Sequence, residues 1–229
     1  MSVQINSPVP NLKLAVCVPS MPQVDVRWSM SFPTFLSTCP MGTTFFGDWH
    51  YGVAESREFL YDTAIRSVPD LTHLVFLDSD ILPAPNVMKL LIEDNKPIVS
   101  GIYFNSLLTG LNAWKDEKAL DMKTAYPDPV VEVDKVGMGI CLMKKQIFDV
   151  LKEEPRPLFF YKIDTMNAKM LSEDFVFFEK LKKYGIKPFV DLRAQCLHIK
   201  SFPVNPDGSI GQPQQPTTTT TTPSTPSGP

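Results

Sequence analysis

The spacing of apolar and polar residues predicts strands and helices in turn along this chain. Short apolar runs bounded by turn residues, typical of strands buried on both faces, occur at residues 12–19, 74–77 and 97–104. Apolar stripes at helical spacing occupy residues 53–66 and 85–94, between these runs. Strand, helix and strand within about thirty residues form the βαβ unit of a parallel sheet. We therefore expect an α/β fold with a mostly parallel central sheet.

Other stretches are less regular. Residues 21–47 carry prolines and aromatic residues and predict irregular structure with at most one helix, near residues 31–37. Residues 105–129 show little periodicity, and a connection of this length is usually either a functional lid or disordered. The second half of the chain predicts strands at residues 130–136, 140–143, 186–190 and 193–199, and helices at residues 144–151 and 172–185.

Composition indicates one globular domain followed by a tail. The chain has 229 residues, of which 43% are hydrophobic and 21% charged, enough to bury a core. Residues 205–229 are rich in proline and threonine and nearly free of apolar side chains, so we expect them to be disordered and residues 1–204 to form the domain. The net charge of -3 argues against nucleic acid as the main partner.

The sequence shows neither a secretory nor a membrane-spanning segment. No basic N-terminal region precedes a long apolar stretch, and no apolar run approaches the ~18 residues needed to cross a bilayer. The cysteines are widely spaced and form no Cys-x-x-Cys pair, which favours free thiols in a reducing compartment over disulfides. We therefore expect a cytoplasmic protein.

The most informative stretch is the end of the strand at residues 74–77, which leads into Asp78, Ser79 and Asp80. In open α/β folds, side chains at the carboxyl ends of strands line the crevice that binds ligands. If the backbone stays extended, Asp78 and Asp80 lie on one face. Adjacent carboxylates repel each other unless a cation lies nearby, and oxygen ligands suit Mg²⁺ or Mn²⁺ shared with phosphate. The alternative is that both residues only solvate a strand end and begin a turn.

Arginine and glycine residues in two other segments have both structural and functional interpretations. Arg57 falls on the apolar stripe of the helix at residues 53–66, where it needs either an acidic partner or a ligand phosphate. Gly137 and Gly139 let the backbone closely approach either another strand or a ligand.

Acidic residues begin the helix predicted at residues 172–185, for which Ser172 is the expected N-cap. Glu173 and Asp174 lie in the first turn, where they either complement the helix dipole or provide a general base. His198 comes late in a predicted strand, and a single histidine in that position is usually structural.

Taken in order, these segments resemble the catalytic domain of GT-A-fold glycosyltransferases, which use nucleotide-sugar donors. Short phage or bacterial members and the yeast Anp1-type mannosyltransferases are the most similar. The resemblance implies a Rossmann-like three-layer sandwich, and a location in the host cytoplasm if the chain is phage-encoded. It rests on residues 16–20, 56–58, 76–80 and 172–175, with His198 downstream.

The resemblance also implies roles for individual residues. Asp80 and His198, together with Asp78, would hold the Mn²⁺ (or Mg²⁺) ion that bridges the donor diphosphate, and the imidazole ligand favours manganese. Asp174 would act as the base in an inverting enzyme or position the acceptor in a retaining one, with Glu173 next to it. The donor would contact Pro19, Ser20, Arg57, Asp78, Gly137 and Gly139.

The expected function is therefore transfer of a sugar, of the hexosyltransferase type, from a nucleoside-diphosphate sugar to an acceptor hydroxyl. The acceptor, whether glycan, protein or small molecule, is not implied, because residues 105–129 match nothing in the family. One alternative is a nucleotidyltransferase of similar architecture, which usually carries a glycine- and lysine-rich loop where this chain has Pro-Ser-Met-Pro at residues 19–22. Another is a non-catalytic module that binds nucleotide sugars.

Overall fold

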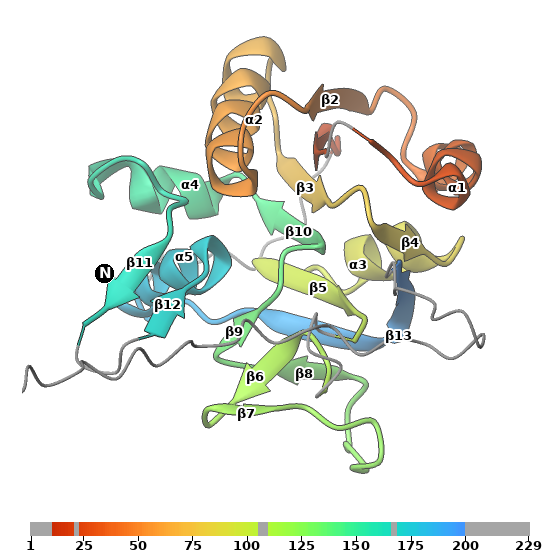
Figure 1. The fold of residues 1–229 in the computed structure, drawn as a ribbon. Coiled ribbons are helices and arrows are strands. Elements are labelled where there is room, and N and C mark those ends of the chain that lie inside the picture. The colour runs from red at the N-terminus through yellow and green to blue at the C-terminus, as the bar shows by residue number, and fades with distance from the viewer. Residues whose placement is uncertain (1–10, 21–22, 105–109, 166–168, 200–229) are drawn as a thin grey trace, which may run out of the picture. The chain divides into compact units, whose positions relative to one another are not determined.

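The computed structural model describes residues 11–20, 23–104, 110–165 and 169–199 (Figure 1). The predicted tail at residues 205–229 lies outside these ranges, so the proposed division of the chain stays a prediction. Within the described ranges, one sheet of eight strands forms the centre of the fold. In spatial order its strands are β2 (Thr44–Asp48), β1 (Leu14–Pro19), β3 (His73–Leu77), β10 (Ile140–Lys144), β5 (Ile98–Ile102), β13 (Phe189–His198) and β4 (Ile81–Pro83), with β8 (Val130–Glu132) paired to β13.

Most strands of this sheet run in the same direction. β1 pairs in parallel with β2 and β3, and β13 pairs in parallel with β5. β10 lies between β3 and β5 and is antiparallel to both, while β4 and β8 are antiparallel to β13. The predicted unit of β3, α3 (Val87–Glu93) and β5 is therefore present, but β10 is inserted between its two strands.

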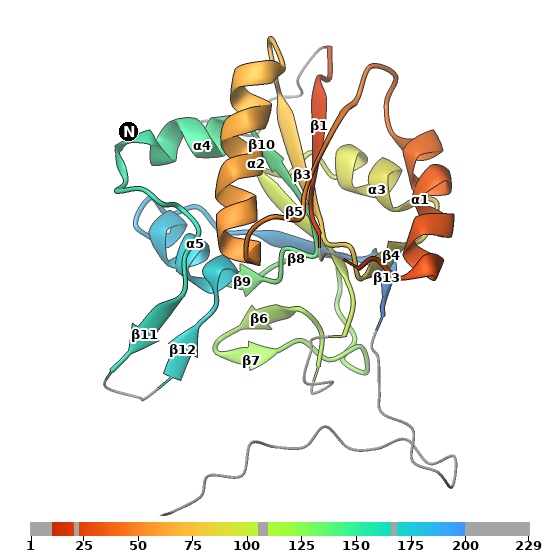
Figure 2. The same cartoon turned by 45° about the horizontal axis from the view of Figure 1, so that its top comes forward.

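Helices cover both faces of the sheet (Figures 1 and 2). Because side chains alternate along a strand, Ala15 and Cys17 of β1 join one hydrophobic core, and Leu14 and Val16 join the other. The first core is covered by α2 (Val53–Ser67), α4 (Gln146–Val150) and α5 (Glu173–Lys182). The second is covered by α1 (Val26–Thr38) and α3, which gives three layers. A 3₁₀ turn (Leu151–Glu153) continues α4. No helix in the described part of the chain is long and apolar enough to cross a membrane.

Two stretches near the N-terminus contain more regular structure than predicted. Within residues 21–47, α1 is longer than expected because Asp25 caps it by accepting a hydrogen bond from the Arg27 backbone N–H at 2.8 Å. β2 in the same stretch was missed, because Gly47 and the polar residues around it hide the strand. Residues 81–83, for which no element was predicted, form β4, which pairs with β13.

Two other predictions about strands were wrong. The single strand predicted at residues 130–136 is two strands in different sheets, because β8 joins the central sheet while β9 joins a small one. The two strands predicted at residues 186–190 and 193–199 are one strand, β13, whose register with β5 shifts between Val190 and Gln195. The smaller elements are β6 (Ala113–Lys115), β7 (Lys118–Ala119) and β9 (Lys135–Val136), and a hairpin of β11 (Lys162–Asp164) and β12 (Lys169–Leu171).

The strand directions bring several segments to one edge of the sheet. The carboxyl ends of β1, β2, β3, β5 and β13 all lie there, because these strands are parallel to one another. The N-termini of α2 and α5 lie at the same edge (Figures 1 and 2). This edge therefore gathers the acidic and basic residues that the sequence singles out.

Candidate active site

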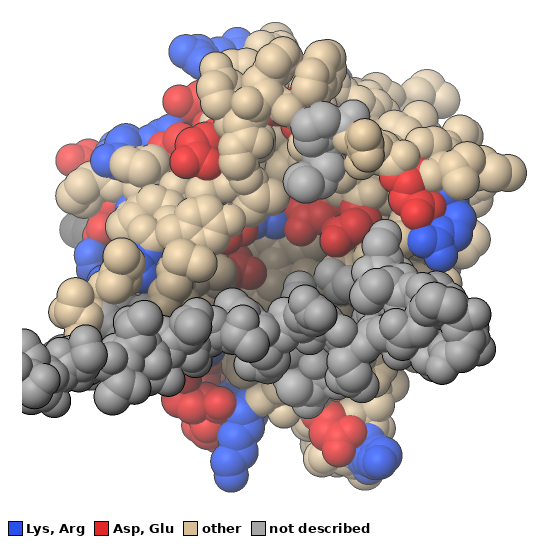
Figure 3. All heavy atoms as spheres, in the orientation of Figure 1, with Lys and Arg blue, Asp and Glu red and all other residues tan. Residues whose placement is uncertain are grey.

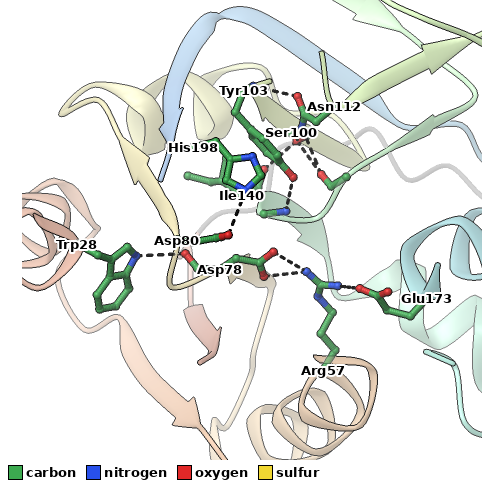
Figure 4. Close-up of polar contacts among 12 residues, drawn as sticks. Trp28, Arg57, Asp78, Asp80, Ser100, Tyr103, Asn112, Ile140, Glu173 and His198 are labelled. Atoms are coloured by element: carbon green, nitrogen blue, oxygen red, sulfur yellow. Dashed lines mark hydrogen bonds and ion pairs between the residues drawn. The ribbon is translucent and has the colours of Figure 1, made fainter. Parts of the chain in front are cut away.

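The turn after β3 sets the positions of the two central carboxylates. The Asp78 carbonyl accepts a hydrogen bond from the Ile81 N–H at 3.1 Å, which closes a turn and directs the chain into β4. The indole N–H of Trp28 donates to the same carbonyl at 3.1 Å, and the Ile199 N–H donates to the Asp80 carbonyl at 2.7 Å. The backbone therefore does not stay extended here, and the two carboxylates do not share a face: Asp78 points toward α2, whereas Asp80 points toward β13 (Figure 4).

Arg57 connects α2 to both β3 and α5. Its side chain is only 2% exposed, and its Nη2 donates to the two carboxylate oxygens of Asp78 at 2.7 and 3.0 Å. Its Nη1 donates to Oε1 of Glu173 (Figure 4). Its Nε is buried and has no hydrogen-bond partner among the described residues. Of the two interpretations of Arg57, the acidic partner is present, and a contact to the donor stays a prediction.

The electrostatics of this edge are dominated by carboxylates. Burial raises the pKa values of Asp78, Glu173 and Asp174 above their ordinary range, although the Arg57 guanidinium opposes this. Burial alone would lower the pKa of Arg57, but the carboxylates of Asp78 and Glu173 outweigh it and raise that pKa. Three carboxyl groups, those of Asp78, Glu173 and Asp174, act on the Arg57 guanidinium, and the Asp80 carboxylate acts on Asp78, so a bound cation would relieve the repulsion among these acids. Figure 3 shows acidic atoms gathered in a hollow on this face.

Asp80 and His198 form a close pair although they are far apart in sequence. His198 Nε2 lies 3.1 Å from Asp80 Oδ2, because β13 pairs with β4 and places His198 opposite Ile81. The other ring nitrogen, Nδ1, lies 2.7 Å from the Phe104 carbonyl oxygen. A carbonyl oxygen only accepts, so Nδ1 carries a proton and donates it. The contact between Nε2 and Asp80 is a hydrogen bond when Nε2 carries a proton, and a cation bound between the two groups would take the place of that proton.

This pair fits the ligands of an octahedral divalent cation. Two neighbouring ligands at about 2.1 Å from such an ion are roughly 3.0 Å apart, close to the 3.1 Å found between Nε2 and Oδ2. Metal-bound histidines commonly donate their other N–H to a backbone carbonyl, as His198 does. In the described ranges, no third His, Cys, Asp or Glu joins a group that could hold a metal. Asp78, whose oxygens face Arg57, stays a predicted ligand.

The two acidic residues that begin α5 have different environments. Glu173 is 5% exposed and is held by Arg57. Asp174 is half-buried, accepts hydrogen bonds from the Ser172 hydroxyl and from the Phe175 N–H, and has a raised pKa. Ser172 occupies the predicted N-cap position, but its side chain bonds to Asp174 instead of capping the helix backbone. Of the two, Asp174 is therefore the better placed to exchange a proton with a ligand.

The glycines at residues 137 and 139 make room for Tyr103. A Cβ at Gly137 would lie 2.7 Å from the Tyr103 hydroxyl oxygen, and one at Gly139 would lie 2.6 Å from it. The Gly139 N–H donates to that hydroxyl at 2.8 Å. Tyr103 also packs edge-on against His198, with ring centroids 5.3 Å apart. The close approach that the glycines allow is thus to a side chain, and contacts to a donor sugar stay a prediction.

A buried polar network, which was not predicted from the sequence, lies behind Tyr103. The Asn112 amide oxygen accepts the Tyr103 N–H at 3.0 Å, and its amide nitrogen donates to the Ser100 hydroxyl at 3.2 Å. Ser100 in turn donates to the Ile140 carbonyl at 2.9 Å (Figure 4). These bonds fix the end of β5 relative to the start of β10. Asn112 lies in the stretch without periodicity, where a single asparagine gives no signal of burial.

Pro19 and Ser20 lie at the same edge, one strand away from Asp78. Pro19 ends β1 and is paired in register with Asp48 at the end of β2. The Ser20 N–H donates to the Asp48 carbonyl at 2.7 Å. Asp48 itself is buried and accepts a hydrogen bond from the Ser56 hydroxyl of α2. The predicted contacts of Pro19 and Ser20 with the donor therefore fall beside the acidic centre, and they stay predictions.

No protein-family model matches this chain, and no curated protein matches it. Among solved structures, A197 from STIV is similar with a TM-score of 0.57 and 20% identity, over 89% of this chain and 95% of A197. A glycosyltransferase involved in the glycosylation of the major capsid of PBCV-1 gives a TM-score of 0.43 at 12% identity, over 82% and 94% of the two chains. A mutant Drosophila β1,4-galactosyltransferase 7, in complex with manganese, UDP-Gal and xylobiose, gives 0.44 at 14% identity, over 83% and 71%.

The fold is a three-layer α/β sandwich that A197 shares, and the assignment to the GT-A type stays a prediction. The predicted three layers and the mostly parallel central sheet are confirmed. The likeness to A197 spans nearly all of both chains and concerns the fold alone. The likeness to Anp1-type mannosyltransferases stays a prediction.

Proposed function

We propose that this chain is a metal-dependent glycosyltransferase, which transfers a sugar from a nucleoside-diphosphate sugar to an acceptor hydroxyl. The observation that carries the proposal is the arrangement of Asp80 and His198. Their facing atoms have the separation of two neighbouring metal ligands, and Nδ1 of His198 is committed to the Phe104 carbonyl. A pair of protein ligands with further positions for phosphate oxygens is typical of sites where a divalent cation binds together with a nucleotide.

A divalent cation at this pair would neutralise the negative charge that develops on the leaving diphosphate. The fold holds both proposed ligands in place. Asp80 is fixed by the turn after β3, and His198 is fixed by its bond to Phe104 and by Tyr103 against its ring. The binding of the donor along the carboxyl edge, from Pro19 and Ser20 to Asp78, follows from the parallel strands that end there.

Asp174 is the residue we assign to the acceptor. In an inverting transfer, the acceptor oxygen forms a bond to the anomeric carbon, the bond from that carbon to the diphosphate oxygen breaks, and the nucleoside diphosphate leaves with the electron pair. The proton of the acceptor hydroxyl passes to the Asp174 carboxylate. Burial raises the pKa of Asp174, which strengthens it as a base. In a retaining transfer Asp174 would position the acceptor.

Calorimetric titration of UDP and of GDP, each with and without Mn²⁺, tests the proposal. We expect one nucleotide to bind in a metal-dependent manner, and we expect Asp80→Ala to abolish both this binding and transfer. Asp121→Ala is a matched control because Asp121 is an exposed aspartate outside the site. Binding that ignores Mn²⁺, or near-normal transfer by Asp80→Ala, would contradict the assignment of Asp80 and His198.

A further inference from the structure

The hairpin of β11 and β12 presents an apolar face to solvent. Ile163 and Met170 are paired across the two strands, so their side chains lie on the same face, and alternation places Tyr161 on that side too. Their exposed fractions are 46% for Tyr161, 72% for Ile163 and 65% for Met170. We call these three residues the hairpin face. Clustered exposure of large apolar side chains on a small element marks an interaction site more often than chance exposure does.

The hairpin is anchored to α5 by its other side. Lys162 forms an ion pair with Glu179 of α5 at 3.2 Å, and Leu171, which pairs with Lys162 across the hairpin, is half-buried. Figures 1 and 2 show the hairpin beside α5 and projecting from the body of the fold. The hairpin face is therefore the side left open after this anchoring.

The hairpin face begins next to the candidate active site. β12 continues directly through Ser172 into Glu173 and Asp174, so Met170 is only about 13 Å or less from Asp174 along extended chain. An apolar surface thus starts within the length of one or two sugar rings of the carboxylate assigned to the acceptor.

The two sides of the candidate site differ in chemistry. Asp80 and His198, where the donor diphosphate is proposed to bind, lie on the opposite side of Arg57 from Glu173 (Figure 4). A group attached to the acceptor that extends away from the donor diphosphate would pass the α5 side of the site, beside which the hairpin lies. A purely polar glycan would gain little from Ile163 and Met170, whereas an aliphatic chain would bury both.

We propose that the acceptor is amphipathic, with its hydroxyl at Asp174 and an attached aliphatic chain packed on the hairpin face. This inference rests on the proposed function for the transfer step. It names the class of acceptor as a hydroxyl compound carrying an alkyl or polyprenyl chain. The alternative occupant of the face, a second copy of this chain, is an outcome of the test below.

The test titrates methyl, butyl, hexyl and octyl β-D-glucosides, below their critical micelle concentrations, into the full chain saturated with nucleotide and Mn²⁺. Because the sugar is constant, the trend reports the aliphatic chain alone. We expect the dissociation constant to fall with each added methylene, by about twofold where it is half buried and about fourfold where it is fully buried. The double variant Ile163→Ser/Met170→Ser should flatten this trend, while Met30→Ser, at a position 76% exposed on α1, should keep it.

The outcomes separate this inference from the proposed function. If nucleotide binds but the dissociation constants of the glucosides do not depend on alkyl chain length, the proposal of an aliphatic acceptor is wrong. It is also wrong if the double variant shows the same dependence as the wild type. Light scattering provides a second check: a wild-type dimer that the double variant converts to monomer identifies the hairpin face as a self-interface and also overturns it. A last outcome is that neither UDP nor GDP binds, while the glucosides, titrated without nucleotide, still bind more tightly as their alkyl chain lengthens. The proposed function then fails, but the hairpin face still binds an aliphatic chain.

Discussion

A buried pair of carboxylates at the end of α3 should make the stability of this protein depend on pH. Asp94 caps the C-terminus of α3, its side chain is 4% exposed, and Asp191 of β13 beside it is fully buried. Nη2 of Arg193 donates to one oxygen of each carboxylate at 2.9 Å, and the second oxygen of Asp94 has no hydrogen-bond partner among the described residues. Burial and then the Asp191 carboxylate raise the pKa of Asp94 to about 7, against the opposing charges of Arg193 and Lys96.

The direction and size of the effect follow from this pKa. The ordinary pKa of this carboxyl is 3.8, so between pH 3.8 and about 7 the folded protein holds a proton that the unfolded chain has released. The free energy of unfolding therefore falls as the pH rises through this window, and the loss is complete above a pH of about 7. At 1.36 kcal/mol for each tenfold change in proton concentration, the loss between pH 5 and pH 8 is about 3 kcal/mol.

The substitution Asp94→Asn isolates this contribution. Its amide is close in shape to a protonated carboxyl and stays neutral at every pH, so the variant should gain about 3 kcal/mol on the wild type between pH 5 and pH 8. Urea unfolding of both proteins at several pH values across this range measures the difference. Asp70→Asn, in an exposed loop position with φ near 55° that asparagine tolerates, makes the same charge change without burial. Parallel pH profiles for the wild type and Asp94→Asn would refute the reasoning.

Three further predictions concern the candidate site. Arg57→Met removes the buried cation that pairs with the buried Glu173 and the partly exposed Asp78, and it should lower the free energy of unfolding by about 3–5 kcal/mol in urea titrations; a loss below about 1 kcal/mol would mean that these ion pairs do not behave as buried ones. Gly139→Ala places a Cβ 2.6 Å from the Tyr103 hydroxyl oxygen and should cost about 1–3 kcal/mol, measured in the same way. Asp174→Asn should keep nucleotide binding but slow single-turnover transfer by about a hundredfold or more, and unchanged turnover would return Asp174 to helix capping.

The sequence predicted the framework of the fold because its signals are local. The apolar run at residues 74–77, the helical stripe at residues 53–66 and the acidic start of α5 are each visible within one element, and all three appear in the structure. The insertion of β10 between β3 and β5 was not predictable in this way. Strand order depends on pairing between distant residues, and periodicity within a segment carries no information about its neighbour.

The site was predicted as a set of residues but not as a set of contacts. Arg57 was expected to meet either an acid or a phosphate, and the choice depended on Asp78 and Glu173, which lie 21 and 116 residues away in sequence. Asn112 was not predicted at all, although it is 1% exposed and joins β5 to the strand that follows the glycines. Its burial is a property of the folded neighbourhood and not of its own segment.

The pairing of β4 with β13 shows how one missed element changes the chemistry of the site. No strand was predicted at residues 81–83, because a segment that contains Pro83 and is followed by Pro85 gives little strand signal, yet Ile81 and Leu82 pair with His198 and Leu197. Only this pairing brings the imidazole of His198 to 3.1 Å from Asp80, while the turn that leads into β4 directs Asp78 away toward Arg57. The same short strand therefore separates the two carboxylates, which an extended backbone would have placed on one face. Asp78 then pairs with Arg57, and Asp80 pairs with His198 at a distance that two neighbouring ligands of a divalent cation would also have.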